Sequence, residues 1–277
     1  MNKKKIDVMN ILKKSIAPIT DKAWEEISDR TNEILKTYLT GRKFVDIDGP
    51  NGLEMGGVST GRLIIPDSQS DNGINYGIRE ILPFVEIRKP FELDLWELDN
   101  IERGAKDVDL SPLEDAVKEV AFFEEKLIYE GFDPIKIKGL QPSAEGDPVA
   151  IPDNTDAFLK ELGRQVLHLS QNGVEGPYSL IINADEWLNL IHLSEGYPIT
   201  MQLKEILGGE VIVNQSNKSS FLVSERGGDY QLIQGQDITL GYDSHDTEKV
   251  KLYLTASFTF RVLSPEAIVV FESKKQA

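Results

Sequence analysis

Residues 91–104 read FELDLWELDNIERG. Its first half alternates apolar and acidic residues, and this period of two places the apolar ones on one face of an extended strand: Phe91, Leu93 and Leu95. Trp96 stands where the strand gives way to an acidic turn, residues 97–102. The pattern predicts an edge strand followed by a solvated turn.

The residues before this strand favour β-structure but offer few apolar side chains for a core. Two strands, residues 58–65 and 74–87, flank the segment PDSQSDNG, and its Asn72-Gly73 pair fits a hairpin turn. A two-stranded ribbon is marginally stable by itself in water. The ribbon therefore needs a neighbour, either from this chain or from another copy.

Two amphipathic helices flank the β-rich region. The first covers residues 20–39, with Thr20 as its N-cap and Gly41 as its stop. A lysine-rich arm, residues 6–19, precedes it and either packs on its own domain or lies at an interface. The second helix starts at the capping box SPLE, residues 111–114, and carries an apolar stripe down to Gly131.

The second half of the chain mixes helices and strands. Three helices are predicted around a buried strand, residues 178–183: residues 155–172, 185–193 and 198–208. The clearest strand is Val250–Val262, whose strict period of two predicts one buried face and one wet face. A final strand covers residues 267–271. Together these elements predict an α+β fold with a separate middle lobe.

Composition restricts the partners. The formal charge is 30 − 46 = −16, and the pI is near 4.7, so the surface repels phosphate backbones and anionic membranes. The absence of cysteine excludes disulfides, zinc ribbons and thiol nucleophiles and fits a reducing cytoplasm. Neither a signal peptide nor a membrane-spanning apolar run is present. We expect a soluble cytoplasmic protein without nucleic-acid or membrane partners.

No catalytic motif emerges from the chain. Each histidine lies on a different predicted element: His168, His192 and His245. Ser244-His245-Asp246 is predicted to be a turn, since adjacent side chains cannot form a hydrogen-bonded triad. The glycine pairs form neither a GxGxxG nor a Walker loop. Glu124 and Glu125 are assigned to the solvated face of the second helix, so no metal site is predicted. We predict that the chain is not an enzyme.

Five long strings, in this order, resemble the shell proteins of the encapsulin family, also called linocin or bacteriocin-like proteins. The strings are GRKFVDIDGP (41–50), LDLWELDNIERG (93–104), EGPYSLIINADEW (175–187), SERGGDYQLIQGQD (224–237) and FTFRVLSPEA (258–267). The resemblance runs from about Ile16 to Phe271, which is nearly the whole chain.

The resemblance implies the Hong Kong 97-like fold of tailed-phage major capsid proteins. Residues 52–90 would form its extended loop, and residues 140–225 its axial domain. The peripheral domain would combine three segments: the N-terminal arm and helix (1–51), the part with the spine helix (91–139) and the strands that return to this domain (226–277).

The resemblance also implies a function. Family members self-assemble into icosahedral nanocompartments, and the smallest closed icosahedral shell of one chain type has about 60 copies. Such shells enclose a ferritin-like iron-storage protein or a dye-decolourising peroxidase and act in iron storage or oxidative stress. The cargo docks through a C-terminal targeting peptide in a groove on the inner wall, here expected at Arg42, Asp46, Ile238 and Leu240.

Some encapsulins bind a flavin (FMN or riboflavin) on the shell surface, stacked on a tryptophan. Trp96 matches that position, and Arg88 and Tyr197 match two others around the flavin. An indole, a second aromatic ring and an arginine could hold an isoalloxazine ring and a phosphate. The alternative is that Trp96 packs against a neighbouring subunit.

Two other functions stay open. A phage or prophage capsid protein would use the same fold, although the acidic charge disfavours a DNA-filled interior. Protease or bacteriocin-type activity would need a nucleophile, a base and an orienting group, which this sequence does not assemble.

Overall fold

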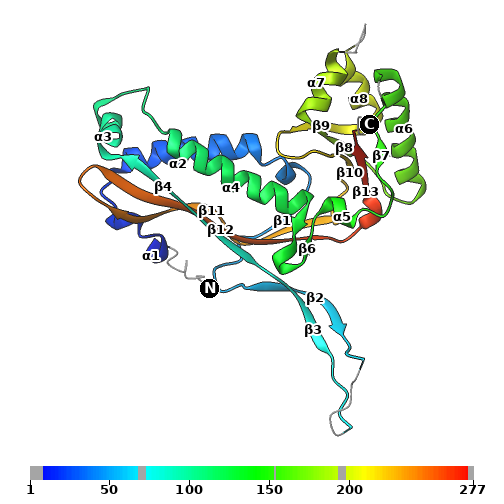
Figure 1. Ribbon diagram of the computed structural model, residues 1–277, viewed down its shortest axis with the longest axis horizontal. Helices are drawn as coiled ribbons and strands as arrows, with labels where there is room; N and C mark the ends of the chain where they lie inside the picture. The colour runs from blue at the N-terminus through cyan, green and yellow to red at the C-terminus, as the bar shows by residue number, and fades with distance from the viewer. Residues whose placement is uncertain (1–8, 68–72, 153, 193–197, 274–277) are drawn as a thin grey trace, which may run out of the picture.

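The chain folds into two lobes and a β-ribbon that projects from the first lobe (Figure 1). A computed structural model describes residues 9–67, 73–152, 154–192 and 198–273. Within these ranges, no helix is both long and apolar enough to cross a membrane.

The first lobe is a four-stranded sheet covered on one face by two long helices, α2 (Asp21–Tyr38) and α4 (Ser111–Tyr129) (Figure 1). Its strands follow the order β1 (Asp46–Asp48), β11 (Tyr230–His245), β12 (Lys249–Val262), β4 (Val85–Asp94). The predicted edge strand is confirmed, because β4 ends the sheet. Phe91 and Leu93 point into the core beneath the helices, where Leu252 and Val117 are also buried.

The two long helices begin in different ways. Thr20 caps α2 as predicted, and its hydroxyl accepts a hydrogen bond from the Ala23 N–H at 3.2 Å. The predicted capping box of α4 is wrong, since the N-cap is Leu110 and makes no side-chain bond. Asp109 instead accepts hydrogen bonds from the backbone and hydroxyl of Ser111, at 3.0 and 2.5 Å.

The predicted acidic turn after β4 is a helix, α3 (Leu95–Arg103). The Asp94 carboxylate caps it and accepts from the N–H groups of Trp96 and Glu97, at 2.8 and 3.3 Å. Leu98 and Ile101, three residues apart, face the core and are buried. Two buried apolar residues at helical spacing thus outweigh the acidic composition of this segment.

The predicted wet face of β12 is also wrong, because its polar side chains are buried: Tyr253, Thr255, Ser257 and Thr259. The N-terminal arm, α1 (Met9–Leu12) and η1 (Lys14–Ile16), lies on this side of the sheet (Figure 1). The Tyr253 hydroxyl donates to the Ile11 carbonyl at 3.2 Å, and Leu12 is buried. Of the two alternatives for the arm, its described part packs on its own lobe.

The second lobe holds a five-stranded sheet in the order β7 (Val149–Ala150), β13 (Ile268–Glu272), β10 (Ser220–Ser224), β8 (Tyr178–Asn183), β9 (Gly208–Asn214). Its helices are α6 (Thr155–Gln171), α7 (Ala184–His192) and α8 (Ile199–Leu207), close to their predicted ranges. Residues 226–277 were expected to return to the first lobe, and β11 and β12 do so, but β13 does not. β13 pairs with β10 and β7 instead, because its apolar side chains, Phe271 among them, fill the core of the second lobe.

The ribbon consists of β2 (Gly57–Ile64) and β3 (Ile78–Pro83), and β3 runs on into β4. The predicted turn at Asn72-Gly73 lies partly outside the described residues. Short elements complete the chain: η2 (Gly41–Lys43), β5 (Gly131–Phe132), η3 (Asp133–Ile135), β6 (Ile137–Lys138), α5 (Leu140–Ser143) and η4 (Pro265–Ala267).

Candidate functional site

Two consecutive carboxylates of α4, Glu124 and Glu125, are fully buried, which corrects their assignment to a solvated face. The stripe that faces the core runs through Val117, Val120 and Ala121, and one further turn of helix brings both glutamates onto it. Because a buried charge is costly without partners, each carboxylate is bonded. These contacts connect α4 with η2 and with the second lobe.

Glu124 pairs with Arg42 of η2 through two hydrogen bonds of 2.6 and 2.7 Å. The Arg42 guanidinium also binds Asp237 of β11 at 2.8 Å. Burial raises the pKa of Glu124, whereas the bonds to both carboxylates outweigh burial and raise the pKa of Arg42. The shift of Glu124 favours a neutral carboxyl, whereas the shift of Arg42 favours an ion pair. The two short, bidentate hydrogen bonds fit the ion pair.

Glu125 has neutral partners. It accepts hydrogen bonds from the Gly41 N–H and the Asn214 side-chain amide, both at 2.8 Å, and it bonds the Thr40 hydroxyl. The backbone at Gly41 packs tightly here, since a Cβ would lie 2.7 Å from Ile128 Cδ1 and 3.2 Å from a carboxylate oxygen of Glu125. Burial raises the pKa of Glu125 to about 7, against the hydrogen bonds from Thr40 and Gly41.

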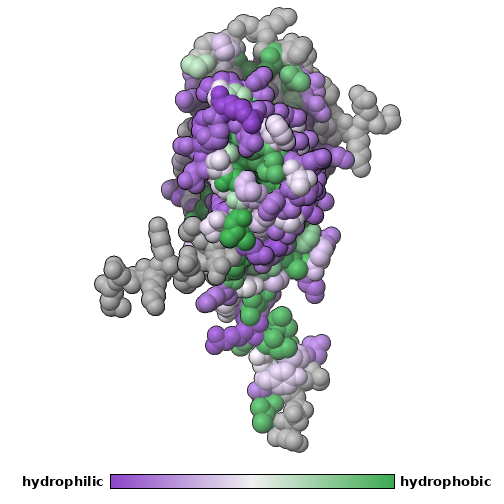
Figure 2. Space-filling view, turned by 90° about the vertical axis from the view of Figure 1, so that its left-hand side faces the viewer, coloured by the Kyte–Doolittle hydropathy of each residue, from purple (hydrophilic) through white to green (hydrophobic). Residues whose placement is uncertain are grey.

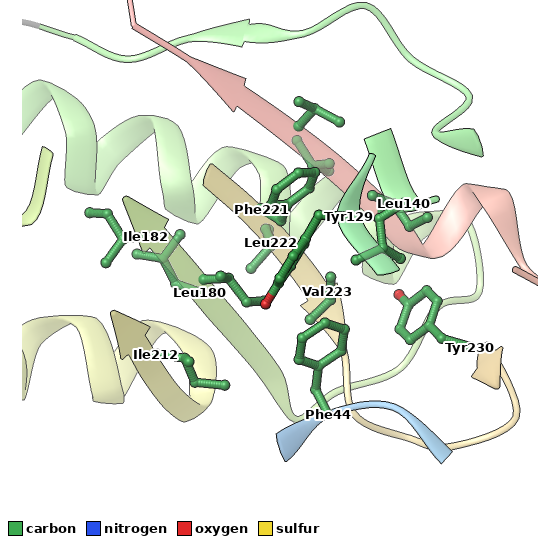
Figure 3. Close-up of a cluster of buried hydrophobic side chains, with 14 of the residues drawn as sticks. Phe44, Tyr129, Leu140, Leu180, Ile182, Ile212, Phe221, Leu222, Val223 and Tyr230 are labelled. Atoms are coloured by element: carbon green, nitrogen blue, oxygen red, sulfur yellow. The ribbon is translucent and has the colours of Figure 1, made fainter. Parts of the chain in front are cut away.

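An aromatic cluster adjoins these polar contacts and spans both lobes (Figure 3). Tyr129 at the end of α4 stacks on Phe221 of β10, with ring centroids 5.3 Å apart. Phe44, just after η2, meets the edge of Tyr230 at 5.9 Å. The two lobes therefore share one core, with the buried carboxylates at its margin.

The residues expected to bind a cargo peptide are only partly brought together. Arg42 and the half-buried Ile238 meet around Asp237. Leu240 is buried in the core of the first lobe. Asp46, in β1, lies beside the start of β11, and its carboxylate accepts a hydrogen bond from the Gly228 N–H at 2.6 Å. Because Arg42 already binds two carboxylates, a peptide carboxylate would have to compete for it.

A groove with a volume of about 300 Å³ lies beside Ile238, where β11 departs from regular pairing with β12. Pro50, Leu53 and Ile238 supply its apolar walls, and Asp237 stands at its rim with half of its side chain exposed. The shape and lining fit an extended segment that inserts an apolar side chain.

Of the residues expected around a flavin, Trp96 and Arg88 do not converge within one subunit. Trp96 lies in the first turn of α3 with 68% of its surface exposed. The nearby cation is Arg103, 5.9 Å from the ring, a residue that the sequence reasoning did not select. Arg88 stacks on Tyr253 at 4.2 Å, on the side of the sheet where the arm lies, and Tyr197 falls outside the described residues.

The string SERGGD, residues 224–229, has a structural role. Arg226 binds Asp229 at 2.9 Å and donates to the Gly173 carbonyl of the second lobe at 2.8 Å. The Gly228 N–H donates a hydrogen bond to the Asp46 carboxylate of the first lobe. Gly227 and Gly228 both have φ of 83°, a conformation that glycine adopts without strain.

In the described ranges, no three or more histidine, aspartate or glutamate side chains are grouped to hold a metal ion. His245 bonds Tyr242 at 2.5 Å, and Asp246 accepts from the Glu248 and Lys249 N–H groups at 2.8 Å each. The prediction of a turn at residues 244–246 is only partly correct, because Ser244 and His245 still belong to β11, where they pair with Lys251 and Val250, and the turn begins at Asp246.

Comparison with known proteins gives consistent matches. A family model described as an encapsulating protein for peroxidase matches residues 9–259. Type 1 encapsulin shell proteins of Brevibacterium linens and Rhodococcus erythropolis are 38% and 36% identical, each over 94% of this chain and 98% and 99% of their own. A ferritin-like–encapsulin shell fusion protein of Pyrococcus furiosus is 25% identical over 73% of this chain and 56% of its own length.

Solved structures define the fold. A virus-like particle from Pyrococcus furiosus has a TM-score of 0.60 at 20% identity and covers 90% of this chain and 98% of its own. A chain of Mycobacterium phage Cain has a TM-score of 0.55 at 12% identity and covers 87% and 92%. The expected Hong Kong 97-like capsid fold is confirmed.

Replacement of Arg42 tests the buried pair. Arg42→Met leaves Glu124 buried without its cation, so the free energy of unfolding should fall by about 3–5 kcal/mol. Arg42→Met/Glu124→Leu should recover most of that loss, because apolar side chains fill the site without charge. Guanidinium unfolding followed by circular dichroism measures both, with Arg62→Met as an exposed control. A loss below about 1 kcal/mol in the single variant would contradict this account.

Proposed function

This chain belongs to the family of type 1 encapsulin shell proteins, and on that premise we propose that its copies assemble into a cytoplasmic icosahedral compartment around a cargo enzyme. Closure of one chain type requires about 60 copies at minimum. The compartment serves iron storage or defence against oxidative stress, according to its cargo.

The projecting ribbon carries this proposal. It stands clear of the body of the subunit and bears an alternation of apolar and polar side chains (Figures 1 and 2). More than half of the surface is exposed for each of its large apolar residues Leu63, Ile64, Ile78 and Ile81. An isolated subunit would leave this surface in water, whereas a neighbouring copy would cover it.

Charges on the ribbon should prevent assembly. Ile64 and Ile78 face each other across β2 and β3, and Ile64→Asp/Ile78→Asp would bury two unpaired charges in every subunit contact. Each buried charge costs about 1–3 kcal/mol or more. The yield of discrete particles should therefore fall at least tenfold, as counted in electron micrographs and measured by size-exclusion chromatography. Gln171→Glu adds a charge at the exposed end of α6, away from the ribbon, and should still assemble. Particle formation by the double variant at the wild-type level would refute the proposal.

Two alternatives receive less support. Phage capsid proteins share the fold, but the relatives above 30% identity are shell proteins and the net charge of −16 disfavours packaged nucleic acid. We propose no catalytic activity for the subunit itself. The residues that a hydrolase needs do not meet in the described ranges: His245 is bonded to a tyrosine, and Asp246 caps a turn.

For cargo capture we propose the groove beside Ile238. Its walls accept an apolar side chain of an extended C-terminal peptide, and the exposed part of Asp237 favours a peptide with a positive charge. Arg42 positions Asp237 through their 2.8 Å bond, and Leu240 anchors the following part of β11 in the core of the first lobe. Asp46 bonds the Gly228 N–H and lies outside the groove.

Loss of the apolar wall should abolish cargo capture and leave the shell intact. Ile238→Asp removes an apolar contact of about 1.5–3 kcal/mol, so co-purification of a ferritin-like cargo with its C-terminal tail should drop roughly 10–100-fold. Leu263→Asp, on an exposed leucine after β12, is the matched control. Undiminished cargo in intact Ile238→Asp particles would exclude the groove.

For a cofactor we propose a flavin on Trp96. The exposed indole offers a stacking face, and Arg103 lies close enough to meet a phosphate. Arg88 would take part only from a neighbouring subunit or after rearrangement, since it stacks on Tyr253.

Washed particles should be yellow if a flavin is bound. Trp96→Ala removes a stacked pair worth about 0.5–1.5 kcal/mol and should reduce the flavin absorbance several-fold, whereas Trp96→Phe should keep part of it. Colourless wild-type particles after incubation with FMN and with riboflavin would exclude both.

A further inference from the structure

The buried cluster at the junction of the lobes has more negative than positive charge. Arg42 supplies one cation, and it is bound to Glu124 and Asp237. Glu125 is as deeply buried as Glu124, yet its partners carry no charge. A carboxylate in this setting has lost its hydration and lies beside a second negative charge, and both effects favour its neutral form.

The hydrogen bonds around Glu125 accommodate a proton. When the carboxyl is ionised, the Thr40 hydroxyl and the Asn214 amide both donate to it. When it is protonated, it donates to Thr40 Oγ1, which can turn its own hydrogen toward the Tyr129 hydroxyl at 2.9 Å. Both protonation states thus find partners without a change of position.

The position of Glu125 connects this proton with the arrangement of the lobes. The Gly41 N–H belongs to η2 of the first lobe, whereas Asn214 ends β9 of the second lobe, and the carboxyl of Glu125 binds both at 2.8 Å. Separation of the lobes would hydrate the carboxyl of Glu125, and the loss of hydration that favours its protonated form would disappear. By linkage, a proton that favours the closed junction is released when the junction opens.

We propose that Glu125 is a proton-dependent contact between the two lobes, protonated when the junction is closed and ionised when the junction opens. Acidic pH therefore holds the junction closed, and the junction loosens as the pH rises to neutral and above. The consequence concerns the subunit itself and stands whether or not the shell encloses cargo.

The sign of the effect follows from the groups that face Glu125. They are Glu124 and Tyr129 on its own helix, with Arg42 of η2 and Asp237 of β11 beyond Glu124, while the second lobe contributes the neutral Asn214. Burial raises the pKa of Glu125 from an ordinary value of 4.5 to about 7. Its stabilising contribution is complete below pH 4.5 and is lost as the pH rises through about 7.

Infrared spectroscopy of the purified full-length protein tests the proposal directly. A buried protonated carboxyl has a carbonyl stretch separate from that of carboxylates, and this band should be present at pH 6 and vanish by pH 8.5. Glu125→Gln should lack it, and Glu130→Gln, an exposed glutamate at the end of the same helix, should keep it. Absence of the band at pH 6, or its persistence in Glu125→Gln, overturns the proposal.

Two further measurements cover the case in which Glu125→Gln fails to fold. Thr40→Val removes a hydrogen bond to the ionised carboxylate and should move the midpoint of the band upward in pH. Hydrogen exchange of the wild type should accelerate at residues 40–43 and 212–217 between pH 6 and 8.5, beyond the intrinsic increase with pH. An unshifted midpoint in Thr40→Val, or exchange that follows the intrinsic rate alone, counts against the proposal.

Discussion

The arrangement of the subunit depends on removing the Arg42–Glu124 ion pair from water. Such burial is tolerable only with nearly ideal geometry, which two hydrogen bonds of 2.6 and 2.7 Å provide. This requirement sets η2 against α4 and brings Gly41 within reach of Glu125. The aromatic side chains beside the pair, Phe44 and Tyr129, then fill the space between the lobes. Polar geometry orients the lobes, and apolar burial supplies most of the stability.

The first lobe combines a stable platform with a surface that needs a partner. The sheet of this lobe is covered on one face by α2 and α4, and the N-terminal arm packs on the other face at Tyr253. The side chains of β12 are buried on both faces. Its edge strand β4 continues directly from β3, and a rigid sheet therefore carries the base of the exposed ribbon. An arm mounted in this way can reach a neighbour with little loss of conformational entropy.

Much of this architecture could be predicted from local patterns. The period of two in β12 and the Thr20 cap gave correct elements, and long matched strings gave the family. The errors came from tertiary contacts. Glu124 and Glu125 have the composition of a surface, although their spacing from Val120 and Ala121 placed them on the buried stripe. The wet face assigned to β12 failed because segments from elsewhere in the chain pack on it: the N-terminal arm, more than 200 residues away in sequence, contacts Tyr253, and the backbone at Gly235 lies against Ser257. The groove at Ile238 needs the irregular pairing of β11, which the sequence pattern does not reveal.

The position of β13 affects the order in which the chain can fold during synthesis. β8, β9 and β10 leave the ribosome before β11 and β12, but β13 follows all of them and pairs between β7 and β10. The sheet that begins to form first is therefore completed last, after the whole sheet of the other lobe has been made. The lobes cannot mature one after the other as independent nascent domains, and the chain must fold cooperatively once residues 268–272 are available.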